Sequence, residues 1–142
     1  LTAEDNQTLE RLADDIVADY LRNIELVRRL AQAYGFHYLF IWQPALCTNQ
    51  ALTAEEKQLA AWTNKKMVRL YQLVYERMAS VQMPHFYNIA TMFDHKKKTL
   101  YFSWAHITEE GNNLVAERLA RIFQQEFPPK VFTPPEKTSN PD

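Results

Sequence analysis

The stretch that decides the fold is Gly35-Phe36-His37-Tyr38-Leu39-Phe40-Ile41-Trp42-Gln43-Pro44, residues 35–44. Between Phe36 and Trp42 every side chain except His37 is apolar or aromatic. A strand buried on both faces has such a nearly continuous apolar sequence, whereas a half-exposed strand alternates. Pro44 ends the run, because proline cannot donate a ladder hydrogen bond. The run therefore predicts a buried strand over 36–42, with His37 as a satisfied core residue.

A long amphipathic helix is predicted before this strand, from Thr8 to Tyr34. Apolar side chains recur there every three or four residues, which is the spacing of one helix face. They are Leu9, Leu12, Ile16, Tyr20, Ile24, Val27 and Leu30. Gly35 follows at the position where a left-handed C-terminal cap favours glycine.

Further helices and a second strand are predicted downstream. Residues 53–56 have the spacing of a capping box, so a helix begins there, with a kink or break near Asn64. The segment His85–Ile89 is typical of a short strand. A last helix is expected after Thr108, ending at Pro128. This order of helices and apolar strands predicts an α/β fold, with a small parallel sheet covered by helices on both faces.

The composition limits the classes of function. The chain has 142 residues, 46% of them hydrophobic, and a formal net charge of -1, which is typical of a soluble globular domain. Sixteen basic residues against seventeen acidic ones give no excess for binding nucleic acid. No apolar run approaches the roughly 18 residues of a membrane-spanning helix. Cys47 is the single cysteine, which excludes an intrachain disulfide and a zinc site built on cysteine pairs.

The C-terminal segment differs in composition from the rest. Five of the fifteen residues from 128 to 142 are proline, and only Val131 and Phe132 are large and apolar. Such a segment cannot bury enough apolar surface to order itself. We therefore expect one domain over 1–127 and a disordered or surface-bound tail over 128–142.

The segment most informative about function is Tyr101-Phe102-Ser103-Trp104-Ala105-His106-Ile107-Thr108-Glu109-Glu110-Gly111-Asn112. It is similar to the histidine loop and following helix start of SGNH (GDSL-type) hydrolases, with His106, Thr108, Gly111 and Asn112 at the matching positions. The resemblance covers roughly the C-terminal half of that domain. It implies a partial three-layer, flavodoxin-like α/β fold and a serine ester hydrolase of the lipase, esterase or acylhydrolase kind. It also implies that His106 is the general base.

The chain departs from the family pattern in two respects. Ser103 stands where the family has the aspartate that orients the histidine, and Asp94 is an alternative candidate for that acid. A Gly-Asp-Ser nucleophile segment and a Gly-x-Asn-Asp segment are absent. We therefore expect the isolated chain to be inactive, and to act on a small ester only when an N-terminal half supplies the serine and the oxyanion hole. Trp104 is the expected ligand contact, and no cofactor or metal is expected.

Alternative interpretations remain open at this point. Ser103 and His106 are three residues apart and form a dyad on paper, and His106 is also compatible with a structural role near a helix start. His85 and His95, taken with His106, fit no recognised zinc spacing. The alternative function is a non-catalytic module that binds a ligand or self-associates. We expect such association through the edge of strand 36–42 or by exchange of helix 8–34.

Overall fold

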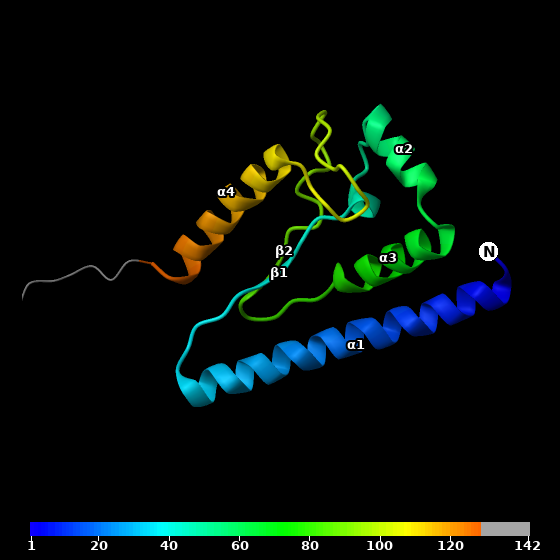
Figure 1. Cartoon of the computed structure of the whole chain (residues 1–142). Coiled ribbons are helices and arrows are strands. Elements are labelled where there is room, and N and C mark those ends of the chain that lie inside the picture. The colour runs from blue at the N-terminus through cyan, green and yellow to red at the C-terminus, as the bar shows by residue number, and fades with distance from the viewer. Residues whose placement is uncertain (129–142) are drawn as a thin grey trace, which may run out of the picture.

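The computed structural model describes residues 1–128, and these residues form four α-helices, one short 3-10 helix and two strands (Figure 1). In chain order the elements are α1 (Ala3–Tyr34), β1 (Phe40–Trp42), η1 (Leu46–Thr48), α2 (Ala54–Trp62), α3 (Lys65–Met78), β2 (Phe86–Asn88) and α4 (Glu109–Glu126). The predicted disorder of the tail falls on residues outside this range, apart from Pro128.

Helix α1 begins at Ala3, five residues before Thr8, so the predicted start was wrong. Thr2 caps the helix: its side chain accepts from the Asp5 amide, and the Asp5 carboxylate accepts from the Thr2 amide, both at about 3 Å. This reciprocal pair satisfies two amides that have no partner in the first helical turn. The ion pair with Lys66 and the Thr2 backbone lower the pKa of Asp5 to about 2. At the other end Gly35 has φ 72°, so the predicted left-handed cap is confirmed.

The two strands pair in parallel, as predicted. Phe40 is opposite Phe86 and Trp42 is opposite Asn88. The predicted strand 36–42 was too long, because β2 offers partners only to the last three of those residues. Residues 36–39 instead connect the helix cap to β1 without pairing, and Phe36 and His37 lie exposed on the surface. His37 is accordingly exposed, with its ring centroid 4.9 Å from that of Phe127, and its predicted place in the core is wrong.

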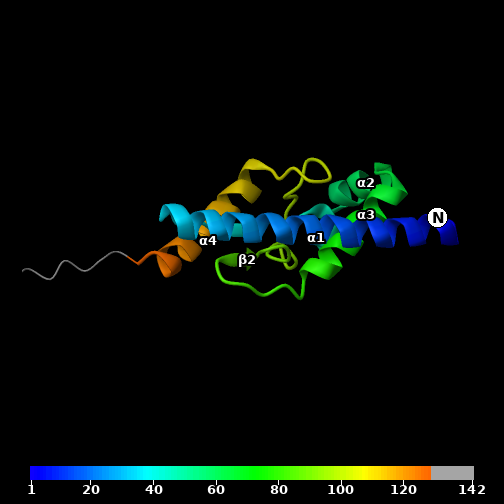
Figure 2. The ribbon, with the colours of Figure 1, turned by 90° about the horizontal axis from the view of Figure 1, so that it is seen from below.

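Helices cover the two faces of this small sheet. Figures 1 and 2 show α1 and α3 side by side along one face and α4 on the other. The Tyr20 ring of α1 packs edge-on against Phe40 and Trp42. On the opposite face, Leu39 and Ile41 share a cavity of about 430 Å3 with side chains of α4. The predicted α/β class with a parallel sheet is thus confirmed.

One edge of β1 has no neighbouring strand within residues 1–128. The Phe40 amide donates to the His85 carbonyl at 2.8 Å, and the Ile89 amide donates to the Trp42 carbonyl at 3.0 Å. Because alternate residues of a strand present their backbone groups to opposite sides, the amide and carbonyl of Ile41 point away from β2. The sheet is two-stranded there, so this edge is open.

Within residues 1–128, no helix combines the length and the apolar character needed to cross a bilayer.

The break predicted near Asn64 is also confirmed. Helix α2 ends at Trp62, and the Asn64 side chain accepts from the Lys66 amide at 2.9 Å to start α3. Asparagine competes well for backbone amides at a helix start, and this side chain therefore begins α3 directly after α2 has ended.

A buried carboxylate joins α2 to the loop before α4. Glu56 is fully buried, and its Oε1 accepts from the amides of Leu100 and Tyr101 at 2.8 and 3.2 Å. Its Oε2 accepts from the Thr53 amide at 3.0 Å. One side chain thus satisfies three backbone donors from two distant segments.

We predict that Glu56→Ala lowers the free energy of unfolding by about 3 kcal/mol, because it leaves these amides without an acceptor. Gln58→Ala is the matched control, since Gln58 is an exposed position of the same helix. Chemical denaturation of both variants measures the difference. Equal stability of the two variants would contradict the structural role of Glu56.

Candidate functional site

The histidine loop, residues 101–107, is a tight hairpin. Tyr101 and Ile107 form an antiparallel bridge across its base. At its tip the amides of Phe102 and Ser103 both donate to the His106 carbonyl, at 3.1 and 3.4 Å. The short closure brings the side chains of residues three apart to the same side of the loop.

The start of α4 holds this loop in place. The Thr108 amide donates to the Leu100 carbonyl at 2.8 Å, and the Thr108 hydroxyl accepts from the Gly111 amide at 3.2 Å. A Cβ at Gly111 would lie 3.0 Å from the Leu100 carbonyl oxygen and 3.1 Å from Cβ of Ile107. Glycine therefore avoids two tight contacts where the helix approaches the loop, and this explains one residue of the sequence pattern in physical terms.

Within the loop, Ser103 and His106 are in direct contact. The Ser103 Oγ lies 2.6 Å from Nδ1 of His106, and the Phe102 ring stacks on the imidazole at a centroid distance of 5.7 Å. Among residues 1–128, no hydrogen-bond partner is found for Nε2. When Nδ1 carries the proton and donates it to Ser103, Nε2 is free to accept a proton from another group.

His106 lines an open cleft of about 460 Å3. The other lining residues are Gln43, Pro44, Phe102, Ala105, Ile107, Asn112 and Val115. Gln43 and Pro44 directly follow β1, so the cleft lies at the carboxyl end of that strand. In open α/β sheets ligands bind at this end of the strands, because loops there converge and leave a crevice.

The other predicted site residues lie elsewhere. The Asp94 carboxylate accepts a hydrogen bond from the Gln50 amide at 3.4 Å. No hydrogen bond or ion pair in residues 1–128 joins Asp94 to His106. Trp104 does not line the cleft; its ring packs edge-on against Tyr71 at 5.8 Å. Phe102 occupies the position next to the imidazole, and the sequence analysis missed it although it is adjacent to Ser103.

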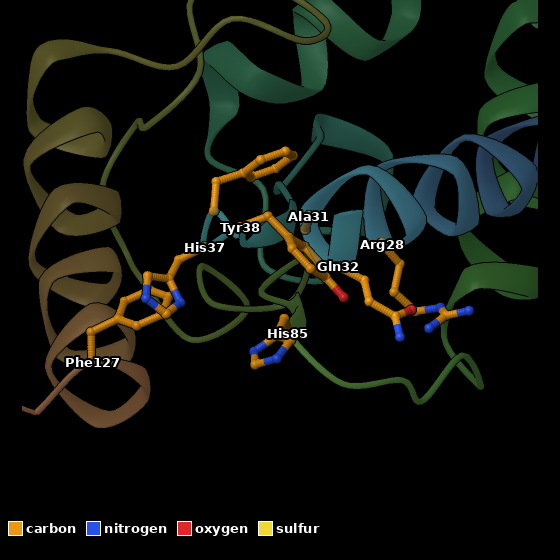
Figure 3. Close-up of a pocket in the computed structure, with 8 residues that line it drawn as sticks. Arg28, Ala31, Gln32, His37, Tyr38, His85 and Phe127 are labelled. Atoms are coloured by element: carbon orange, nitrogen blue, oxygen red, sulfur yellow. The ribbon is translucent and has the colours of Figure 1, made fainter. Parts of the chain in front are cut away.

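A second cavity, of about 350 Å3, lies at the opposite end of the sheet (Figure 3). It is formed by the end of α1, the segment before β1, the start of β2 and the end of α4, with His37 and Phe127 close together. Its charged group, Arg28, already donates to Glu25 at 2.6 and 2.8 Å. This cavity is at the amino ends of both strands and offers no charged group free for a ligand.

Beside this second cavity, Glu126 ties the end of α4 to β2. Its carboxylate accepts from Nδ1 of His85 at 2.8 Å and from the Tyr87 hydroxyl. The Tyr87 hydrogen bond, followed by that of His85, lowers the pKa of Glu126. In residues 1–128 no cluster of three or more His, Cys, Asp or Glu side chains is arranged to hold a metal ion.

Comparisons with known proteins do not extend this description. No family model matches the chain, and neither does any curated protein or solved structure.

The lowered pKa of Glu126 predicts a loss of stability in acid. A carboxylate with a depressed folded-state pKa stabilises the fold above its ordinary value of 4.5, and this contribution disappears as the pH falls through the folded value. We expect amides of the last turn of α4 to lose protection from exchange below that pH in the wild type. In Glu126→Gln their protection should depend less on pH, while the exposed control Glu117→Gln behaves as wild type. Identical profiles in all three proteins would contradict the prediction.

Proposed function

We propose that this chain is the base-bearing C-terminal portion of an SGNH-type serine ester hydrolase, and that it is inactive until a nucleophile-bearing segment completes the site. The observation that carries the proposal is the contact of 2.6 Å between Ser103 and Nδ1 of His106 at the carboxyl end of β1. It matches the resemblance in the loop sequence, in which the residue three before the histidine orients the ring.

The roles follow from the proton positions. Ser103 accepts a hydrogen bond from Nδ1–H, which leaves the lone pair of Nε2 available toward the cleft. A serine hydroxyl from another segment, placed in the cleft, transfers its proton to Nε2 as it attacks the ester carbonyl. The imidazolium then returns the proton to the leaving alcohol. Phe102, stacked on the ring, restricts its rotation during both transfers.

The neutral partner, Ser103, makes His106 a less effective general base in catalysis than a histidine paired with an aspartate. In serine proteases, replacement of the buried aspartate by a neutral residue lowers kcat by about 10⁴-fold, because the imidazolium loses its charged partner and the tautomer is no longer fixed. Ser103 retains the hydrogen bond without the charge. The completed site would consequently hydrolyse esters slowly.

The open edge of β1 supports a second candidate, the self-associating or ligand-binding module. An unpaired strand edge with apolar side chains on both faces accepts another strand readily. Leu39 and Ile41 face one flanking helix and Phe40 faces the other, so an added strand would be buried on both sides. The same edge is where a missing N-terminal half would pair. Ester hydrolysis after an N-terminal half has been added distinguishes the hydrolase from the self-associating or ligand-binding module.

The purified chain should show no hydrolysis of short-chain nitrophenyl esters above a heat-denatured sample, because its sequence contains neither a Gly-Asp-Ser nucleophile segment nor a Gly-x-Asn-Asp segment. His106→Ala should have the same rate as the wild type. Turnover that disappears in both His106→Ala and Ser103→Ala would instead establish the loop dyad as the active site and contradict the proposal.

Adding a separately produced N-terminal half of an SGNH hydrolase should generate ester hydrolysis that requires His106. In that complex Ser103→Asp should raise kcat by at least about tenfold, as a charged partner is restored to Nδ1. Asn113→Asp is the matched control, because it adds the same charge near the loop at an exposed residue that does not line the cleft. If Asn113→Asp increases the rate as much as Ser103→Asp, the orienting role of residue 103 is wrong.

A further inference from the structure

One side of α1 carries exposed apolar side chains that its contact with α3 leaves uncovered. Leu12, Ile16, Leu26, Leu30 and Tyr34 are between 37 and 78% exposed. Leu12 and Leu30 are separated by five full helical turns, as are Ile16 and Tyr34, so they point in the same direction. Single exposed leucines are ordinary, but a continuous line of them marks an interaction surface.

The spacing of this line is symmetric about Asn23. We call seven residues on this side of the helix the α1 stripe: Leu12, Ile16, Tyr20, Asn23, Leu26, Leu30 and Tyr34. The spacings between successive members are four, four, three, three, four and four residues, which is the same sequence of spacings in either direction. A two-fold interface must be self-complementary, because each patch meets its own copy. When two such helices run antiparallel with Asn23 on the axis, every member of the stripe is opposite another member. Tyr20, whose ring also packs against Phe40 and Trp42, offers only its exposed part to the other copy.

The charges of α1 favour the same arrangement. From Ala3 to Asp19 the helix has six acidic residues and one basic residue, a net charge of -5. From Tyr20 to Tyr34 it has three basic residues and one acidic residue, a net charge of +2. Antiparallel packing places the acidic half of one helix beside the basic half of the other, whereas parallel packing places like charges together.

Individual residues on the outer flank of the stripe agree with this register. With Asn23 on the axis, Arg29 of one copy is opposite position 17 of the other, between Asp15 and Asp19. Arg29 pairs with Glu25 and Asp19 pairs with Arg22 within α1, but their side chains are 72% and 63% exposed, so both remain accessible to a second chain. Complementary charges beside an apolar seam select orientation and register.

We propose that a second copy of this chain covers the α1 stripe, through antiparallel packing of the two α1 helices about a two-fold axis at Asn23. The Asn23 amides hydrogen-bond to each other across the axis, which penalises other registers. The stripe adjoins the open edge of β1, because Ile16 and Tyr20 line a cavity of about 440 Å3 together with Ile41. The dimer therefore shields one face of that edge. This inference does not depend on the catalytic role proposed for His106.

A cysteine at the axis tests the register directly. Asn23→Cys should form an intermolecular disulfide rapidly under mild oxidation, since a residue on a two-fold axis meets its own copy. Ala18→Cys is the matched control, an exposed position of the same helix on a different face. The wild type is the blank: Cys47 is half-buried, and burial raises the pKa of its thiol to about 11, so it oxidises slowly. Cross-linking of Ala18→Cys as fast as Asn23→Cys would overturn the proposal.

Association in solution gives an independent readout. Light scattering should show a wild-type dimer at tens of micromolar, and Leu30→Asp should raise the dimer Kd by about a hundredfold, because each copy loses a buried leucine. Ala18→Asp should leave the Kd unchanged. Helical circular dichroism and thermal unfolding confirm that both variants are folded. A monomeric wild type, or a dimer that both substitutions leave intact, would overturn the proposal, the latter pointing to the edge of β1 instead.

Discussion

The position of the histidine loop depends on the hydrogen bonds that the Glu56 carboxylate accepts. It is buried, it completes the cap of α2, and it accepts the amides of Leu100 and Tyr101 from a segment more than forty residues away. A buried carboxylate is stable only when hydrogen bonds replace its hydration, so its amide partners cannot move independently of α2. Helix α2 consequently holds the base of the histidine loop and the start of α4 in place.

This attachment positions the chemistry. Tyr101 is the first residue of the histidine loop, and Gly111 lets the following helix approach the Leu100 carbonyl so closely that a Cβ there would lie only 3.0 Å from its oxygen. The loop is then short enough for Ser103 to reach the imidazole of His106. The same framework places the cleft at the carboxyl end of β1, the strand whose other edge is open.

Signals contained in a few consecutive residues predicted the elements well. Gly35, Thr53 and Asn64 act through their own φ angles or through side chains that reach amides two or three positions away, and each is a cap or a break where expected. Errors arose where the outcome required a partner. Apolar sequence alone predicted a strand from Phe36, but a strand extends only as far as its neighbour, and β2 pairs with three residues. The cap at Thr2, which was not predicted, follows the same local rule, because its side chain accepts from the Asp5 amide three residues away.

By itself, the sequence determined the α/β class and the caps at Gly35, Thr53 and Asn64, since these depend on periodicity or on the local geometry of neighbouring residues. The histidine loop was predicted from a family resemblance in its sequence instead. Only the tertiary structure decided which side chains meet. It placed Phe102 rather than Trp104 beside the imidazole, and Asp94 beside Gln50. It also made Glu56 an acceptor for a distant segment as well as a capping residue. Such contacts depend on how helices and loops pack in three dimensions, and residues that are distant in sequence carry no local signal of that packing.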